Sequence, residues 1–587
     1  MSLNTQSLQP IINFLWTVAD DVLVNTYQKG KYKDVILPMI VIRRLDVLLE
    51  PTKDQVLKTF DHYKDKLQNL ESLLTSIKHG SGLAFYNTSQ FTLKKLLQDP
   101  KNLRSNFENY LNGFSDNVQD IIKQFKFRNE IETLYEAEIL FSLIEKFCSP
   151  KIELHPDKLP PLAMGYVYED LVRRFNEENN EEAGEHFTPR EIIDLMTHLV
   201  FLPVKKKIQE GTFLVYDPCV GSGGMLTIAK QFILNPEGLI RSKATVHLYG
   251  QESTPFIYAT CKSDMLIKGE DPDKIAYGST LSQYGLDNEL KFDFMLTNPP
   301  YGKTWAPDKK ALGVGPKGAI IDKRFKVGQS RVTDGQLMFV LHMLSKMKDT
   351  KLGSRIASIH NGSALFTGDA GQGESEIRKH IIQNDLVEAI IALPNDMFYN
   401  TGIPTYIFVF TNRKDAHRRG KIQLINANSE KFYSKMRRPL GKKRVEFSSE
   451  HINEINKMFL AFEENEFSKI RDNDDFGFNQ ITVHRPERDG KGDIISDNMG
   501  NPKSDNKRKD IENIPLIEDI QEFFDREVLP FTPDAWWDKK ETKVGYEINF
   551  AKYFYNHKPP RALTEIAKDI FAIEQETEGL LKEIIEV

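Results

Sequence analysis

Residues 213–225 read Phe-Leu-Val-Tyr-Asp-Pro-Cys-Val-Gly-Ser-Gly-Gly-Met, and this stretch decides the fold. The apolar residues Phe213 to Tyr216 predict a buried strand, the glycines after Asp217 predict a tight turn, and residues 225–234 predict a helix. Glycine allows positive φ and lets a ligand approach the backbone, as binding of a nucleoside at the end of a parallel strand requires. We therefore expect an α/β fold with a Rossmann-like, mostly parallel sheet.

A second predicted strand, residues 245–250, is followed by Gln251 and Glu252. In a βαβ unit an acid at this place binds the ribose, so Glu252 is the candidate ribose ligand. A nicotinamide or flavin oxidoreductase would use the same elements. The Gly-x-Gly-x-x-Gly spacing of such enzymes is not met here, because position 226, where the third glycine would stand, is Leu. These elements alone leave hydride transfer and methyl transfer open.

The tetrapeptide Asn298-Pro299-Pro300-Tyr301 follows the apolar run 294–296, which predicts another buried strand. This tetrapeptide favours methylation of an exocyclic amino group. An aromatic amine is a poor nucleophile while its lone pair is delocalised, and two acceptors that hold both of its protons let the nitrogen pyramidalise. The Asn298 side chain and the Pro299 backbone each offer a carbonyl oxygen.

The other two residues of the tetrapeptide fit the same chemistry. Pro300 stiffens the turn, and the Tyr301 ring offers a flat face to a planar base. Such stacking contributes about 1–3 kcal/mol per base, comparable with the few kcal/mol needed to extrude a nucleotide from a duplex. The alternative interpretation is a proline-rich turn at the end of a strand, with Tyr301 packed on the surface.

Three motifs in this order, residues 184–190, 217–225 and 298–301, resemble the modification (HsdM-type) subunits of type I restriction-modification systems. Residues 388–394, 398–405, 545–548 and 559–561 extend the resemblance over nearly the whole chain. The resemblance implies an adenine-N6 DNA methyltransferase that uses S-adenosylmethionine.

The resemblance also implies roles for individual residues. The catalytic residues are Asn298, Pro299, Pro300 and Tyr301. The cofactor-binding residues are Glu185, His186, Phe187, Thr188, Pro189 and Arg190, which close over the methionine end, with Asp217, Gly221, Ser222, Gly223 and Gly224 of the glycine turn and Glu252 at the ribose. Without the resemblance, Thr188 is predicted as a helix N-cap, with Pro189 at the first helical position and Glu191 three residues after the cap.

One segment departs from the family pattern. After the third predicted strand, near Ala276 and Tyr277, the family commonly has an acid or amide following glycine, whereas here Gly278 is followed by Ser279 and Thr280. Only a weaker hydroxyl contact to the adenine ring of the cofactor is expected there.

Composition bounds the class of protein. A chain of 587 residues predicts two to four domains. No apolar run approaches the roughly 20 residues that cross a bilayer, and no export signal opens the chain, so a cytoplasmic location without membrane contact is expected.

The cysteines Cys148, Cys219 and Cys261 show neither metal-ligand nor disulfide spacing, and no metal site is expected. Pro218-Cys219 is similar to the cytosine-C5 methyltransferase motif, but a packing role is favoured for Cys219.

Charge is unevenly distributed. The formal net charge of −6 argues against a protein that coats nucleic acid indiscriminately. Residues 302–335 nevertheless carry eight Lys or Arg against three acids, and residues 413–444 carry twelve against Asp415 and Glu430. Such runs are usually solvated faces, but a basic segment that follows the tetrapeptide directly could equally contact phosphates.

The apolar periodicity divides the chain. Helical spacing predicts an all-helical domain for residues 1–160, and alternating strands and helices predict the catalytic domain, residues 161–415. Residues 416–515 combine the second basic stretch with a polar segment, 485–513, which is predicted as a long flexible excursion. Residues 516–587 are predicted as a helical tail, with helices over 516–529 and 562–585.

The long tail helix has an apolar stripe that includes Ile566, Ile570 and Ile573. Such a stripe packs against a core or a partner helix, and the resemblance implies a specificity (S) subunit as that partner. It also implies double-stranded DNA, a restriction (R) subunit and a second modification subunit as partners.

Several other activities fit the sequence less well. A zinc deaminase has no support in the histidine pattern, and a cytosine-N4 enzyme more often has Ser or Asp where Asn298 stands. A protein glutamine-N5 methyltransferase uses Asn-Pro-Pro-Tyr too, but those enzymes are compact. An inactive assembly scaffold of the same fold is the alternative from a different class, and Ser279 is the residue that encourages it.

Overall fold

The computed structural model describes residues 8–178, 188–313, 320–399, 401–497, 500–555 and 562–585. The chain divides into two units, residues 1–548 and 549–587. Within these described stretches, no helix is both long and apolar enough to cross a membrane.

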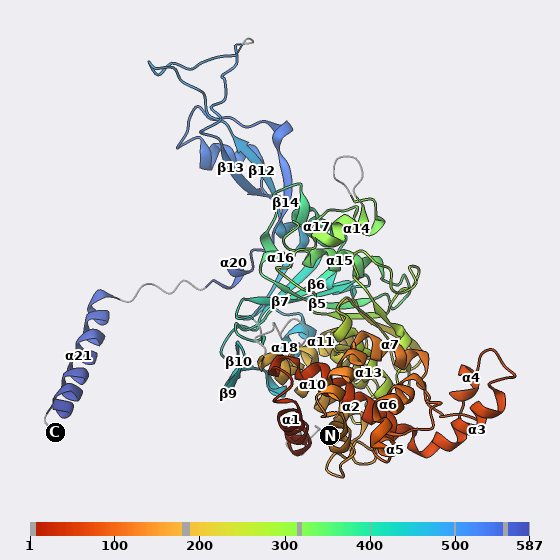
Figure 1. Ribbon diagram of the computed structural model, residues 1–587. Coiled ribbons are helices and arrows are strands. Elements are labelled where there is room, and N and C mark those ends of the chain that lie inside the picture. Colours follow the sequence, from red (N-terminus) through yellow and green to blue (C-terminus); the bar gives the residue numbers. More distant parts are fainter. Residues whose placement is uncertain are drawn as a thin grey trace. The chain divides into compact units, whose positions relative to one another are not determined.

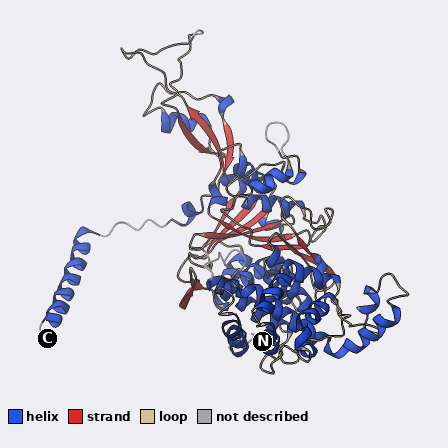
Figure 2. Ribbon diagram, viewed as in Figure 1, coloured by secondary structure: helices blue, strands red, loops and turns tan. Residues whose placement is uncertain are grey.

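The predicted strand at residues 213–216 lies inside a nine-stranded sheet with the order β11-β8-β6-β7-β5-β4-β1-β2-β3. Figure 2 draws the strands in red and the helices in blue. Its strands are β1 (Thr212–Asp217), β2 (Thr245–Glu252), β3 (Ile275–Tyr277), β4 (Phe294–Thr297), β5 (Arg355–Asn361), β6 (Val387–Ala392), β7 (Thr405–Thr411), β8 (Lys421–Asn426) and β11 (Ser468–Asp472). Only β7 and β11 run antiparallel to their neighbours. The carboxyl ends of β1, β2, β4, β5 and β6 therefore share one edge, which we call the carboxyl edge.

Helices cover both faces of this sheet, as the alternation predicted. They are α11 (Arg190–Phe201), α12 (Gly224–Leu234), α13 (Pro255–Ile267), α14 (Ala306–Leu312), α15 (Gln336–Ser345), α16 (Ser363–Phe366), α17 (Gly373–Gln383) and α18 (Ser449–Ala461). Alternate residues of the strands form one buried core with α11, α12, α13 and α18. On the opposite face α15 contacts the sheet, where the Tyr216 hydroxyl lies 3.1 Å from Nε2 of His342.

The N-terminal part of the chain is all-helical, as predicted (Figure 1). Its helices are α1 (Gln9–Leu23), α2 (Tyr32–Leu49), α3 (Lys53–Tyr63), α4 (Glu71–Leu74), α5 (Leu93–Leu96), α6 (Leu103–Asn112), α7 (Asp116–Gln124), α8 (Phe127–Glu136), α9 (Leu140–Phe147) and α10 (Pro161–Glu178). Its core includes residues of α10 and of α13. Asp120 of α7 also accepts hydrogen bonds from Tyr258 and Lys262 of α13, at 2.8 and 3.0 Å.

Residues 416–548 hold more β-structure than the sequence indicated. Beyond β8 and β11 the structure forms a hairpin of β9 (Ser434–Leu440) and β10 (Lys443–Glu446), and a three-stranded sheet of β12 (Gly477–Val483), β13 (Asp510–Pro515) and β14 (Lys543–Tyr546). In the described part of the predicted excursion, isolated bridges and turns order the chain, because Asp489 accepts hydrogen bonds from the backbone of Lys491 and Asp493. The polar residues of this segment therefore belong to an exposed stretch of chain that turns and isolated bridges hold in place.

The predicted helix over 516–529 is shorter in the structure. The α-helix begins at Ile520, because the Asp519 carboxylate caps the N–H groups of Gln521 and Glu522. This helix, α19 (Ile520–Phe523), continues as a π-helix to Val528. The second unit contains α20 (Phe550–Phe554) and α21 (Leu563–Ile585), the long helix predicted for the tail.

Candidate active site

The candidate site lies at the carboxyl edge, where the ends of β1, β2 and β4 are joined by polar contacts. Asp217, the last residue of β1, is 1% exposed. Its Oδ1 accepts hydrogen bonds from the Thr297 hydroxyl at 2.7 Å and from the Cys219 backbone at 2.9 Å. Because Thr297 ends β4, this contact fixes Asn298 relative to the glycine turn.

Glu252 joins the glycine turn to the end of β2. One carboxylate oxygen accepts the Gly221 N–H at 3.2 Å, and the other accepts the Thr254 N–H at 2.7 Å. Each oxygen of a carboxylate can accept a further bond, so Glu252 keeps capacity for two ligand hydroxyls. Within the turn, Gly221 and Gly223 have φ of +54° and +88°. The sequence prediction that these glycines adopt positive φ is confirmed at both positions.

The start of α11 differs from the sequence prediction. Pro189 is the N-cap residue, the helix begins at Arg190, and no side chain caps it. The prediction that Thr188 caps the helix with Pro189 inside it is wrong, because the Thr188 hydroxyl accepts a hydrogen bond from Nδ2 of Asn298 at 3.1 Å. The Arg190 guanidinium lies 3.2 Å from the centre of the Tyr166 ring. Glu185, His186 and Phe187 lie outside the described residues.

The contact with Thr188 leaves Asn298 with an unused acceptor. Its Oδ1 is buried and has no hydrogen-bond partner among the described residues. A buried carbonyl without a donor costs free energy, so such an atom indicates a place where a ligand donates. Tyr301, three residues after Asn298, is half-buried and packs against the core that the strands form with α11, α12, α13 and α18.

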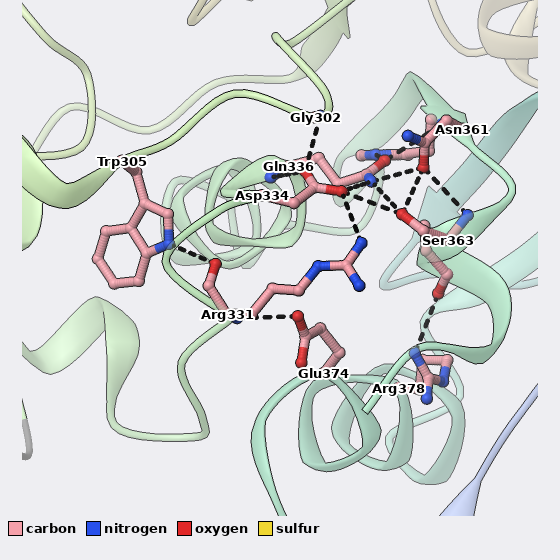
Figure 3. Close-up of polar contacts among 11 residues, drawn as sticks. Gly302, Trp305, Arg331, Asp334, Gln336, Asn361, Ser363, Glu374 and Arg378 are labelled. Carbon is pink, nitrogen blue, oxygen red and sulfur yellow. Dashed lines mark hydrogen bonds and ion pairs between the residues drawn. The ribbon is translucent and has the colours of Figure 1, made fainter. Parts of the chain in front are cut away.

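A polar cluster holds the chain that follows Tyr301. We call Asp334, Gln336, Asn361 and Ser363 the Asp334 cluster (Figure 3). Oδ1 of Asp334 accepts the Gly302 N–H at 3.1 Å, and Oδ2 accepts the Ser363 hydroxyl at 3.0 Å and the Gln336 amide at 2.7 Å. The turn after the tetrapeptide is therefore tied to the carboxyl end of β5. The sequence alone did not indicate this role; the signal it held was an acid, Asp334, at the end of the basic segment.

The basic segment 302–335 is not uniformly available to a ligand. Arg324 is turned inward: it pairs with Asp322 at 2.8 Å and donates to the Thr280 and Leu281 carbonyls at 2.9 and 2.7 Å. Phosphate contact by Arg324 is therefore contradicted. Lys317 lies outside the described residues, whereas Lys303, Lys310, Lys323, Lys326 and Arg331 are exposed.

The loop after β3 is bonded to the glycine turn. The Thr280 hydroxyl donates to the Pro218 carbonyl, and the Ser279 N–H donates to Oε1 of Gln283 at 3.2 Å. The hydrogen of the Thr280 hydroxyl is thus engaged within the protein.

Burial controls ionisation in the glycine turn. Burial raises the pKa of Asp217 to about 7, and the nearby Glu252 carboxylate adds to the rise. Burial also raises the pKa of the Cys219 thiol well above its usual range. A protonated thiol is a poor nucleophile, which agrees with a packing role for Cys219.

Gly223→Ala should destabilise the fold. An added Cβ would lie 2.9 Å from Cε of Met265 and 3.1 Å from Sγ of Cys261, at a φ that L residues rarely adopt. Gly269→Ala is the matched control, because its φ is +75° but no heavy atom lies within 4 Å. Urea unfolding should show Gly223→Ala to be less stable than the control by about 1–3 kcal/mol, the cost of overpacking. Equal midpoints for the two variants would contradict the described packing.

Asp217→Asn should change how stability depends on pH. Between about pH 4 and pH 7 the folded protein holds a proton on Asp217 that the unfolded chain has released, so this group favours folding at low pH and that contribution is lost as pH rises through 7. Urea unfolding at several pH values between about 5 and 8 should show the wild type losing stability relative to Asp217→Asn. A constant difference across this range would contradict the raised pKa.

The chain is similar to known proteins over most of its length. The N-6 DNA Methylase family profile matches residues 162–487, more than half of the chain, and the HsdM N-terminal domain profile matches residues 11–147. The type I restriction enzyme MjaIX methylase subunit of Methanocaldococcus jannaschii is 26% identical over 478 residues, 77% of either chain. The HindI methylase subunit of Haemophilus influenzae is 30% identical over 45% of this chain and 54% of its own length.

A solved structure shares the fold. The type I restriction-modification system methyltransferase subunit from Streptococcus thermophilus superposes with a TM-score of 0.59, at 20% identity, over 79% of this chain and 96% of that one. The matches confirm the resemblance to HsdM-type subunits and the α/β methyltransferase fold predicted from the sequence. The chain therefore belongs to the N-6 DNA methylase family, with an HsdM-type N-terminal domain preceding the methylase domain.

Proposed function

We propose that this protein transfers a methyl group from S-adenosylmethionine to N6 of an adenine in DNA, as the modification subunit of a type I restriction-modification system. The buried, unpartnered Oδ1 of Asn298 at the carboxyl end of β4 is the observation that carries this proposal. Family membership and the names of the relatives, which are methylase subunits of restriction enzymes, support it.

The residues at the carboxyl edge fit the cofactor. The Glu252 carboxylate has acceptor capacity for both ribose hydroxyls, and Gly221 and Gly223 have no side chain that would keep a ligand from the backbone where β1 ends. Asp217 adds a carboxyl group that can ionise near neutral pH. We assign cofactor binding to these residues together with Thr188, Pro189 and Arg190. Bound there, S-adenosylmethionine would supply an electrophilic methyl group on a sulfonium.

The residues of the tetrapeptide prepare the amine. Oδ1 of Asn298 and the Pro299 carbonyl accept the two N6 hydrogens, which draws the nitrogen lone pair out of conjugation with the ring. The Tyr301 ring supports the extruded base by stacking. Transfer of the methyl group would form an N–C bond and break the S–C bond of the donor, and the nitrogen would then lose one proton to solvent. No covalent bond to the protein is needed.

Thr188 sets the orientation on which this step depends. Its hydroxyl accepts the Asn298 amide N–H, so the acceptor end of the amide faces the ligand. The Asp334 cluster holds Gly302, the residue after Tyr301, and so limits where the ring can lie. Pro300 has no backbone N–H to compete for these acceptors.

The proposed partners are double-stranded DNA, a specificity subunit, a restriction subunit and a second modification subunit. On α21 the apolar stripe is exposed, at 38% for Ile566, 58% for Ile570 and 62% for Ile573. A stripe at this spacing fits a helix of another subunit. We therefore assign α21 to the contact with the specificity subunit.

Asn298→Ala should abolish most turnover and keep cofactor binding. Removing an acceptor that the reacting amine requires should lower kcat by about tenfold to a hundredfold, equivalent to about 1–3 kcal/mol. Labelled methyl transfer to DNA measures kcat, and calorimetry measures the cofactor Kd. Asn298→Asp, which keeps an acceptor oxygen, should retain more activity than Asn298→Ala. Undiminished turnover in Asn298→Ala would refute the role of this side chain, and product found only at cytosine would refute the adenine assignment.

A further inference from the structure

The β9–β10 hairpin presents a dense group of unpaired cations. The side chains of Lys435, Arg437, Arg438, Lys442 and Arg444 are all exposed. None of these five forms an ion pair or a side-chain hydrogen bond within the part of the chain that the structure describes. We call β9, β10 and these side chains the basic hairpin; Figure 1 labels the two strands. Like charges carried by one short hairpin repel one another, so a bound polyanion would stabilise them.

The other cations of the same basic stretch behave differently. Four of them are already paired with acids of the sheet and its connections: Arg413 with Asp349, Lys414 with Asp385, Arg418 with Glu388 and Lys421 with Asp472. Most cations of the stretch 413–444 therefore fall into two groups. Four are engaged in internal ion pairs, and the five of the basic hairpin are left available to a ligand.

The basic hairpin is attached firmly at the carboxyl edge. The Lys442 and Arg444 N–H groups donate to the Tyr399 and Asp396 carbonyls, each at 2.8 Å. Residues 396 and 399 belong to the loop that follows β6, and β6 ends at the same edge as β4 and β5.

A second attachment leads directly to the candidate site. The Lys443 ammonium is buried and pairs with Glu191 at 2.5 Å. Glu191 lies in the first turn of α11, three residues after Thr188, which binds the Asn298 amide. The basic hairpin is thus connected to the catalytic tetrapeptide through the Lys443–Glu191 ion pair, the start of α11 and the hydrogen bond between Thr188 and Asn298.

We propose that the basic hairpin binds phosphates of the DNA strand that carries the target adenine. This inference rests on the proposed function, because it takes its ligand from the reaction at the carboxyl edge. An extruded adenine remains attached to its backbone, so phosphates must lie beside the site where Asn298 receives the base. Cations on a rigid hairpin at that edge neutralise those phosphates and hold the strand in register without reading its sequence.

The test removes three of these charges in the full-length chain. The variant is Arg437→Gln, Arg438→Gln and Lys442→Gln. The matched control is Lys205→Gln, Lys206→Gln and Lys207→Gln, because these exposed lysines precede β1 and lie at the opposite edge of the sheet. Fluorescence anisotropy with a labelled duplex of mixed sequence gives Kd over a range of salt concentrations.

The hairpin variant should bind the duplex about tenfold or more weakly, and the slope of log K against log salt should fall by about 0.9 for each phosphate that the variant no longer neutralises. The control should keep the wild-type slope. In methylation assays of the assembled complex the variant should raise KM for DNA, with the cofactor Kd unchanged.

A hairpin variant with the wild-type slope would overturn the inference. So would a variant that binds DNA normally but no longer assembles with its partner subunits, because the basic hairpin would then serve an acidic protein surface. Failure of the proposed function is a separate result: the wild-type complex would yield no N6-methyladenine, whatever the salt slopes of the two variants.

Discussion

The hydrogen bond from the Asn298 amide to the Thr188 hydroxyl is the interaction on which the rest of the site depends. An amide can face a ligand with its donor or its acceptor, and only the acceptor suits an exocyclic amine. By engaging the amide nitrogen, Thr188 leaves Oδ1 buried without a partner among the described residues. A side chain before α11 thereby sets which atom of the amide of Asn298, the residue after β4, is left without a partner.

The parallel sheet explains why these groups meet. Asp217, Glu252 and Asn298 stand at or directly after the carboxyl ends of three neighbouring strands, and backbone N–H groups of the glycine turn join two of them. The same edge receives the Asp334 cluster from β5 and the basic hairpin from the loop after β6. The proposed sites for cofactor, base and phosphate thus lie along one edge of the sheet.

The sequence predicted the parts whose physical signal is local. Apolar runs bounded by glycine and proline indicated β1, β2 and β4, and helical spacing indicated the N-terminal domain and α21. The β9–β10 hairpin was missed because exposed, cationic strands lack apolar alternation. The capping prediction for Thr188 failed because a distant residue, Asn298, competes for its hydroxyl. The inward turn of Arg324 and the role of Asp334 likewise depend on contacts across the fold, which local sequence does not encode.

The most direct test is the structure of the assembled complex with a non-reactive cofactor analogue and cognate duplex DNA. We expect one adenine outside the helix, its N6 about 3 Å from Oδ1 of Asn298 and from the Pro299 carbonyl, and its ring against Tyr301. An adenine that remains stacked, or an N6 atom that faces away from Asn298 while the analogue occupies the edge of β1 and β2, would contradict the proposed chemistry.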